Sequence, residues 1–409
     1  MPATLVSFLG TGRKNSPQDP RSEYTLTTYG FTHPRLGTVE QTTSLFGAAL
    51  LRFLLQCGAT IDRWLVLGTS ASLWSELNQV LDKPGSVLEE YCQIDDKVLT
   101  RSATAGDLET WQGVLNAQAA PVEFQLCLTG EGLEQTSQQK IARALFDHVP
   151  RGNDIIFDIS HGFRHQPVIA TYVVSLMRWT HAVRNVSFFS GVWEARQNDV
   201  APVVELPICQ ELVEAAEAAA VLDVTGNYEP VAQRLGLDAS LAWFMESTNQ
   251  LANARKPAKQ LADSYLDGAD IVQAELARLL RDRLQWASHG TFAARCRESA
   301  GAALEHGDYV RAAILAYEAI ISQCLQLLYR GDLFNYEHRE AAEQELFNRL
   351  SGDDRRNLKI LQWTRNACAH GTRSNQAEAQ QALRSPQDFR ALVIQSFDLF
   401  ARLPTLLTP

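Results

Sequence analysis

The chain has 409 residues, more than one hydrophobic core usually holds, so we expect at least two domains. It is 45% hydrophobic and 21% charged, which is typical of a folded globular protein. The formal net charge of -10 excludes a wide basic face for duplex DNA or an anionic membrane, so any nucleic acid must be held by a local patch.

Targeting and cysteine patterns indicate a cytoplasmic protein. Seven cysteines are scattered without C-x-x-C spacing, which predicts reduced thiols, no disulfide framework and no zinc site. The first residues, "MPATLVSFLG", lack a basic region followed by a long apolar stretch, so we expect no signal peptide. The longest apolar stretch, "PVIATYVVSLM", is too short to span a bilayer.

Up to about residue 206, strand-like runs alternate with helical patterns. The predicted strands are "TLVSFLG" near the start, "RWLVLGT" (63–69), "VEFQLCLTG" (122–130), "NDIIFDIS" (153–160) and "VRNVSFFSG" (183–191). Helix-like segments follow the second, third and fourth of these strands. This alternation predicts an α/β domain with βαβ units and a mostly parallel sheet.

After "VVELP" (203–207) the periodicity is helical and no further strand is expected. From Val310 to Leu328, apolar side chains recur every three or four positions, which marks one buried helix face. We place the boundary so that an α/β domain spans 1–222 and an all-α domain spans 223–409. The first carries 16 basic and 24 acidic residues and the second 21 and 23, so the helical half repels a polyanion less.

The first strand ends in "LGTG" (9–12), where Gly10, Thr11 and Gly12 can bring backbone N–H groups close to a phosphate. A dinucleotide fingerprint needs a third glycine and an immediate helix, but "RKNSPQDPRS" follows, with two prolines. A hydride-transfer enzyme is therefore disfavoured. A tight turn without a ligand stays the other interpretation of this motif.

A second polar loop lies in "FDISHGFRHQP" (157–167), between a buried strand and a helix expected to begin near Pro167. Ligands of parallel sheets bind beyond the carboxyl ends of the strands, and the guanidinium of Arg164 can grip a phosphate there. His161 and His165 are four positions apart, but neither a carboxylate nor a third histidine has ligand spacing, so we expect no metal.

A third loop of this kind lies in "VLGTSASLW" (66–74), with Thr69 and Ser70 at the strand end and Ser72 placed to cap the next helix. Three strand ends with small, hydrogen-bonding residues and nearby arginines predict a pocket for a phosphate-containing ligand.

Near the C-terminus, "RNACAHG" (365–371) ends a predicted helix for which Gly371 is the terminator. Arg365 and His370 lie about 140° apart on an ideal helix, so two copies meeting across a two-fold axis would bring them together better than one. An imidazole can move the proton of an RNA 2′-hydroxyl, and a guanidinium can stabilise the phosphate charge. The alternative is a surface arginine and a helix-end histidine that interacts with the helix dipole.

Together, "SFLGTG", "LGTSASLW", "DISHGFR" and "RNACAHG" resemble the CARF–HEPN ribonucleases of type III CRISPR systems, which cyclic oligoadenylate activates. The segment "DYVRAAILAYEAI" resembles an early HEPN helix. The resemblance covers nearly the whole chain. It implies a Rossmann-like CARF sensor over 1–222 and, within 223–409, a HEPN core over about 291–409.

The resemblance also implies a homodimer whose two CARF domains form one pocket across the two-fold axis. We expect no cofactor and, as activator, cyclic tetra-adenylate, because its two-fold symmetry suits that pocket, although a hexa-adenylate ring has a two-fold axis as well. The implied ligand-binding residues are Gly10, Thr11, Gly12, Thr69, Ser70, Ser160, His161, Gly162, Phe163 and Arg164. The implied catalytic residues are Arg365, Asn366 and His370.

The activity implied is metal-independent endonucleolytic cleavage of single-stranded RNA, leaving 2′,3′-cyclic phosphate ends; some relatives also cleave their activator in the CARF pocket. No membrane or duplex DNA partner is expected. Two alternatives stay open: a catalytically silent sensor or oligomerisation protein, and a nucleotide-binding Rossmann-like enzyme with a helical dimerisation domain. We assign no role to residues 223–290.

Overall fold

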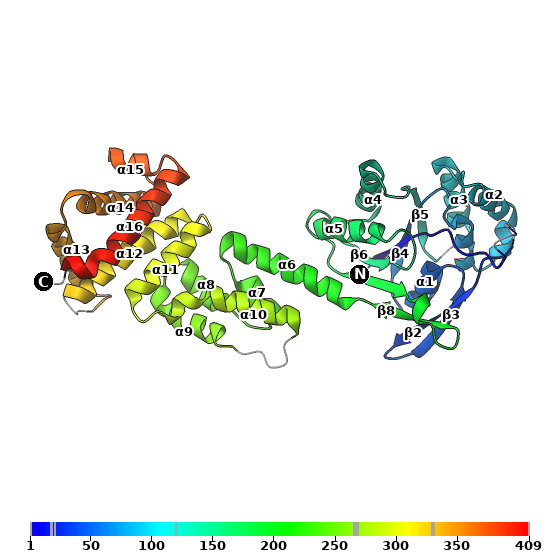
Figure 1. The fold of residues 1–409 in the computed structure, drawn as a ribbon, viewed down its shortest axis with the longest axis horizontal. Coiled ribbons are helices and arrows are strands. Elements are labelled where there is room, and N and C mark those ends of the chain that lie inside the picture. Colours follow the sequence, from blue (N-terminus) through cyan, green and yellow to red (C-terminus); the bar gives the residue numbers. More distant parts are fainter. Residues whose placement is uncertain are drawn as a thin grey trace. The chain divides into compact units, whose positions relative to one another are not determined.

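The structure, a computed structural model, describes residues 2–16, 19, 22–118, 121–264, 270–328 and 332–407. The chain divides into two compact units, Met1–Val213 and Glu214–Pro409, here called the sheet unit and the helical unit (Figure 1). The division lies within helix α6 (Pro207–Thr225), and the boundary expected between residues 222 and 223 falls in the same helix.

The described part of the sheet unit contains one eight-stranded sheet with strand order β3-β2-β8-β7-β6-β1-β4-β5. The strands are β1 (Ala3–Phe8), β2 (Thr27–His33), β3 (Gly37–Thr43), β4 (Ile61–Gly68), β5 (Glu123–Leu128), β6 (Asp154–Asp158), β7 (Val186–Gly191) and β8 (Val200–Glu205). The β2–β3 and β7–β8 pairs are antiparallel, and the other neighbouring pairs are parallel. The predicted mostly parallel α/β fold is confirmed.

Helices cover both faces of this sheet, which explains why all six residues of β1 are buried. Leu5 belongs to a core cluster with residues of α1 to α3, whereas its neighbours Val6 and Phe8 belong to a second cluster with residues of α4 and α5. The helices of the sheet unit are α1 (Phe46–Gln56), α2 (Leu88–Leu99), α3 (Ala105–Ala117), α4 (Gln135–His148) and α5 (His165–Thr180), with the short 3₁₀ helices η1 (Trp74–Val80), η2 (Pro84–Val87) and η3 (Trp193–Ala195).

The central strands β1, β4 and β6 end at the same edge of the sheet. In the parallel register, Phe8 lies opposite Leu67 and Ser7 lies opposite Asp158. The three polar loops singled out in the sequence therefore begin side by side, as their positions after the strands predicted.

Three local features differ from the prediction. The hairpin β2–β3 was not expected, because β3 is polar and largely exposed and so lacks an apolar strand pattern. The strand β8 was not expected either. The segment after β4 forms the 3₁₀ helix η1 instead of an α-helix, and the Ser72 hydroxyl donates to the Leu9 carbonyl (2.6 Å) instead of capping. Helix α5 begins at His165, two residues before the expected start.

The helical unit is built around one apolar helix, α12 (Tyr309–Leu328), which packs against α11, α13, α14 and α16. Among the described residues, α12 alone has the length and apolar composition to cross a membrane, but 61% of that apolar window is buried in the unit. The other helices are α7 (Glu229–Arg234), α8 (Ser240–Ser247), α9 (Leu251–Ala262), α10 (Ile271–Arg283), α11 (Phe292–Glu305), α13 (Tyr336–Arg349), α14 (Gly352–His370), α15 (Ala377–Ala382) and α16 (Pro386–Leu407), with the 3₁₀ helix η4 (Gln285–Ser288).

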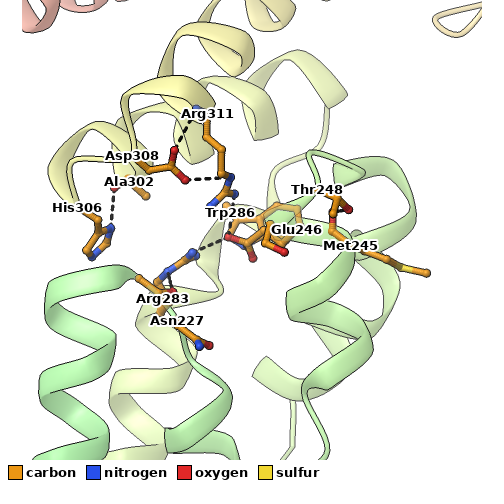
Figure 2. Close-up of polar contacts among 12 residues, drawn as sticks. Asn227, Met245, Glu246, Thr248, Arg283, Trp286, Ala302, His306, Asp308 and Arg311 are labelled. Carbon is orange, nitrogen blue, oxygen red and sulfur yellow. Dashed lines mark hydrogen bonds and ion pairs between the residues drawn. The ribbon is translucent and has the colours of Figure 1, made fainter. Parts of the chain in front are cut away.

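A buried carboxylate joins several helices of this unit (Figure 2). Glu246 Oε1 on α8 lies 2.5 Å from Arg283 Nη2 and 3.5 Å from Arg311 Nη2, and its side chain is 1% exposed. The Trp286 indole donates to Glu246 Oε2 (3.1 Å), and Arg283 Nε donates to the Gly226 carbonyl just after α6 (3.0 Å). Part of residues 223–290 thus forms a bundle that is anchored to α12 by its ion pairs.

Candidate functional site

A cavity of about 370 Å³ lies where the loops after β1, β4, β5 and β6 meet. Its lining residues are Leu9, Gly10, Thr11, Thr69, Ser70, Ala71, Ser72, Arg101, Glu131, Gly162, Phe163 and Gln166. Most of these residues offer backbone groups, hydroxyls or a small side chain, and Arg101 and Glu131 are the charged ones.

Hydrogen bonds hold the first two loops together. The Ser72 hydroxyl, which donates to Leu9, also accepts from the Thr69 N–H (2.9 Å), and the Leu73 N–H donates to the Gly10 carbonyl (2.9 Å). Because these hydrogen bonds join the two loops, the backbone of Thr69 and the side chain of Ser72 are fixed without a ligand.

The conformation of the loop after β6 depends on two residues. Gly162 was expected from the sequence, but Gln166 was not. Gly162 has φ +84°, and a Cβ there would lie 2.8 Å from Phe8 Cβ and 2.7 Å from Gln166 Oε1, so only glycine fits. The buried Gln166 side chain accepts from the Phe163 N–H (3.1 Å) and donates to the Gly130 carbonyl (3.1 Å). Gln166 therefore joins the loops after β5 and β6, and no pattern in "RHQP" indicates this role.

The cavity brings together some of the predicted ligand residues and leaves others out. It is lined by Gly10, Thr11, Thr69, Ser70, Gly162 and Phe163 but not by Gly12, Ser160, His161 or Arg164. The Ser160 hydroxyl accepts from the Gly191 N–H (2.8 Å), which holds β6 to β7. Arg164 is exposed at the cap of α5. Arg101, which lines the cavity, is a cation that the sequence analysis did not single out.

His161 and His165 do not form a pair. A Cβ on Gly10 would lie 3.4 Å from His161 Cβ, which places this histidine between the loops after β1 and β6. His165 Nε2 is hydrogen-bonded to the Glu131 carbonyl (2.8 Å). No group of three histidine, cysteine or acidic side chains suited to a metal occurs in the part of the chain that the structure describes.

A fully buried carboxyl group lies below the cavity, at the end of β6. Burial raises the pKa of Asp158, and this effect is opposed by the nearby His161 and by hydrogen bonds from Ser160. Asp158 Oδ1 accepts from the Ser160 N–H (2.9 Å), whereas Oδ2 is buried without a partner. The folded chain therefore binds a proton on the Asp158 carboxyl more tightly than an exposed aspartate does.

Helix α5 presents an exposed apolar stripe that begins next to the cavity loop. Val168, Tyr172, Leu176 and Trp179 are 56, 76, 53 and 70% exposed and follow one another at three- or four-residue spacing on one helix face. Monomeric proteins rarely expose contiguous apolar patches of this kind, which usually mark an interface.

The candidate nuclease residues lie on α14, and Gly371 (φ +61°) caps this helix as predicted. Arg365 contacts the Tyr317 ring of α12, with 4.8 Å between its guanidinium carbon and the ring centroid, and its Nη1 donates to Asn366 Oδ1 (2.8 Å). It lines a cavity of about 500 Å³ that also contains Glu318, Glu340 and Glu343 among its lining residues.

His370 occupies the last turn of α14 and is exposed. In the described part of the chain, no hydrogen bond or ion pair joins it to Arg365. One chain thus brings Arg365 and Asn366 together but leaves His370 apart, in keeping with the expected angle of about 140° on an ideal helix.

No protein-family model and no curated protein sequence matches the chain. Among solved structures, Enterococcus italicus Csm6 bound to cyclic hexa-2'-fluoro-hexa-dAMP matches over 100% of this chain and 95% of its own, with 12% sequence identity and a TM-score of 0.35. A likeness this distant carries no functional argument.

Proposed function

We propose that this chain is a CARF–HEPN ribonuclease, a cytoplasmic homodimer that cuts single-stranded RNA when cyclic oligoadenylate binds. The observation that carries the proposal is the joint presence of two features. One is the cavity at the carboxyl ends of β1, β4 and β6, lined by the "LGTG", "LGTSAS" and "SHGF" loops. The other is the RNACAH motif at the exposed end of a helix packed on the core of the helical unit.

The cavity suits part of a cyclic oligonucleotide. Backbone N–H groups at Gly10 and Gly162 and the hydroxyls of Thr11, Thr69 and Ser70 can bind phosphates and riboses, and Arg101 adds a positive charge. Its volume of about 370 Å³ is near the lower end of small-molecule sites. We therefore expect each copy to hold part of the ring, with cyclic tetra-adenylate as the activator and a second copy completing the site.

The apolar stripe on α5 supports this dimer. Burying Tyr172 and Trp179 against a second copy would remove two large rings from water, next to the loop that contains Phe163. A two-fold axis beside α5 would bring two cavities close enough to share one ring. Arg164, exposed at the start of the same helix, would then face the ligand of the second copy.

The nuclease chemistry follows from the side chains of α14. The imidazole of His370 moves the proton of the RNA 2′-hydroxyl, and this oxygen attacks the neighbouring phosphorus. Arg365 stabilises the charge that develops on the phosphate, and Asn366 holds its Nη1 by a hydrogen bond. The attack breaks the bond between phosphorus and the 5′-oxygen of the next nucleotide, and the imidazolium gives its proton to that oxygen, so the products carry 2′,3′-cyclic phosphate and 5′-hydroxyl ends. The nucleophile belongs to the RNA itself, so this route requires no metal.

The test is to incubate the full-length protein with a fluorescent single-stranded RNA, with and without each ring size of cyclic oligoadenylate, in excess EDTA. We expect cleavage only with a matching ring, and the tetra-adenylate is the expected one. Ligand binding without cleavage would identify a silent sensor. Failure to bind any ring would leave the nucleotide-binding enzyme as the better interpretation. Loss of cleavage in EDTA, with recovery in magnesium or manganese, would refute the metal-free mechanism.

A further inference from the structure

A second cavity of the helical unit, of about 640 Å³, has a basic and aromatic wall. It lies between α13 and α14, and its lining includes Arg355, Arg356 and Lys359 with one acidic residue, Glu378. Arg356 Nη2 lies 3.8 Å from Glu378 Oε1, so this exposed pair offsets one positive charge and leaves Arg355 and Lys359 in excess. In a chain with a formal net charge of -10, this excess forms a local patch suited to an anion.

Two aromatic rings flank the central lysine. Lys359 Nζ lies 5.1 Å from the centroid of the Phe347 ring and 5.7 Å from that of Trp363. Phe347 also packs against the core of the helical unit, but Trp363 does not belong to the core that the described residues form. The half-buried indole of Trp363 therefore lines the cavity from outside the core.

This cavity adjoins the one that Arg365 lines, because Gln344, Phe347 and Lys359 contribute to both. Lys359 and Arg365 are six residues apart on α14, which corresponds to about 9 Å along the helix. Of the acidic residues that line the Arg365 cavity, Glu318 is paired with Arg339, whereas Glu340 and Glu343 repel a phosphate chain. A polyanion is therefore guided to Arg365 from the basic side, past Lys359.

We propose that the cavity between α13 and α14 binds an unpaired nucleotide of single-stranded RNA close to the bond that is cut. The base stacks on Trp363, and Arg355, Arg356 and Lys359 hold the adjoining phosphates. Stacking of bases on aromatic rings beside a cationic groove is the usual way in which proteins bind single strands, and it tolerates any base. This inference rests on the proposed nuclease function and specifies where its substrate lies.

The experiment uses the full-length protein with His370→Ala, so that bound RNA stays intact, and measures fluorescence anisotropy with a labelled single-stranded RNA and with its duplex. Adding Trp363→Ala should weaken single-strand binding about tenfold, the loss expected for one base stack, while Trp363→Phe should restore most of it. Lys359→Ala with Arg356→Ala should weaken binding and lower its dependence on salt. The matched control is Arg281→Ala, which removes an exposed arginine of α10 outside the cavity.

The outcomes separate this site from the nuclease proposal. Unchanged RNA affinity in a folded Trp363→Ala protein would overturn the site, even if the parent protein cuts RNA. An equal loss for single strand and duplex would refute stacking of an unpaired base, and competition by adenosine monophosphate at the affinity of the RNA would identify a free-nucleotide site instead. Binding that depends on Trp363 in a protein that never cuts RNA would leave the site standing and refute the nuclease.

Discussion

The guanidinium of Arg365 lies over the Tyr317 ring, with 4.8 Å between its central carbon and the ring centroid. Glu343, which lines the same cavity, accepts hydrogen bonds from the Tyr317 hydroxyl (2.6 Å) and the Gln362 amide. Among the described residues no carboxylate forms an ion pair with Arg365. The arginine is thus positioned by stacking on Tyr317 and by its hydrogen bond to Asn366, which leaves its charge available to the anionic substrate that we propose.

His370→Ala should lower the rate of RNA cleavage on the order of a hundredfold or more, because proton transfer is lost. Arg365→Ala should do similar damage, since the phosphate charge is then unopposed. Cleavage, cyclic-oligoadenylate affinity and melting temperature are to be measured on the same proteins. Affinity and melting temperature should barely change for His370→Ala, because the histidine is exposed at the helix end. Near-native cleavage by this variant would show that RNACAHG is the end of a helix and has no catalytic role.

Arg101→Ala and Arg164→Ala should each raise the concentration of cyclic tetra-adenylate needed for half-maximal cleavage, with near-normal cleavage at saturation. Arg101 lines the cavity of its own chain, whereas Arg164 does not, so in the dimer that we propose Arg164 would contact the ligand of the second copy. Isothermal titration calorimetry with both variants checks this. If affinity in the Arg164→Ala protein equals that of the parent, this arginine has no part in the pocket.

If the proposed dimer forms through α5, Tyr172→Glu with Trp179→Glu should convert it to a monomer, because two charges on the apolar stripe oppose burial. Sedimentation equilibrium measures the change, and Leu88→Glu, at an equally exposed apolar residue of α2, is the control. The same double variant should lose ligand-stimulated cleavage. A variant that stays dimeric would place the interface elsewhere.

Asp158→Asn should flatten the dependence of stability on pH. Burial raises the pKa of Asp158, so the folded chain binds this proton more tightly than the unfolded chain does. Its contribution to the free energy of unfolding is therefore full below the ordinary aspartate pKa and is lost as the pH rises through the raised value. Urea midpoints of the sheet unit between pH 4 and 8 should fall with pH in the parent and less in the variant. Parallel profiles would contradict the raised pKa.

Glu246→Ala should destabilise the helical unit by about 3–5 kcal/mol, because removing one partner leaves buried charges uncompensated. Here Arg283 and Arg311 would both lose their shared carboxylate. Urea unfolding followed by circular dichroism gives the value. Glu275→Ala, which removes the acid of the exposed pair with Arg278, should leave the transition nearly unchanged.

The sequence predicted the elements whose patterns are local. The five strands with apolar runs and the helix that ends at Gly371 were expected, and so was the meeting of three polar loops at one edge of the sheet. The hairpin β2–β3 was missed because its edge strand is polar, so its pairing depends on tertiary context.

The site residues that sequence reasoning missed share another cause. Arg101 lies in a turn, and Gln166 is the second residue of α5. Neither residue belongs to a recognisable motif, and only the fold brings them to the cavity. Trp363 lies on α14 with the apolar residues Leu358 and Leu361, but of these three only the two leucines are in the core. Helical periodicity shows which side chains share one face of a helix. It does not show whether that face packs against the core or lines a cavity.

Helix α5 follows directly on the loop that contains Gly162 and Phe163, and its exposed stripe starts at Val168. When a second copy completes the ring site, activator binding and self-association become one linked equilibrium. By reciprocity, the activator then tightens the dimer by the same factor by which dimerisation tightens activator binding. The concentration of activator at which RNA is cut would accordingly depend on the concentration of the protein in the cell, so that its expression sets the sensitivity of the response.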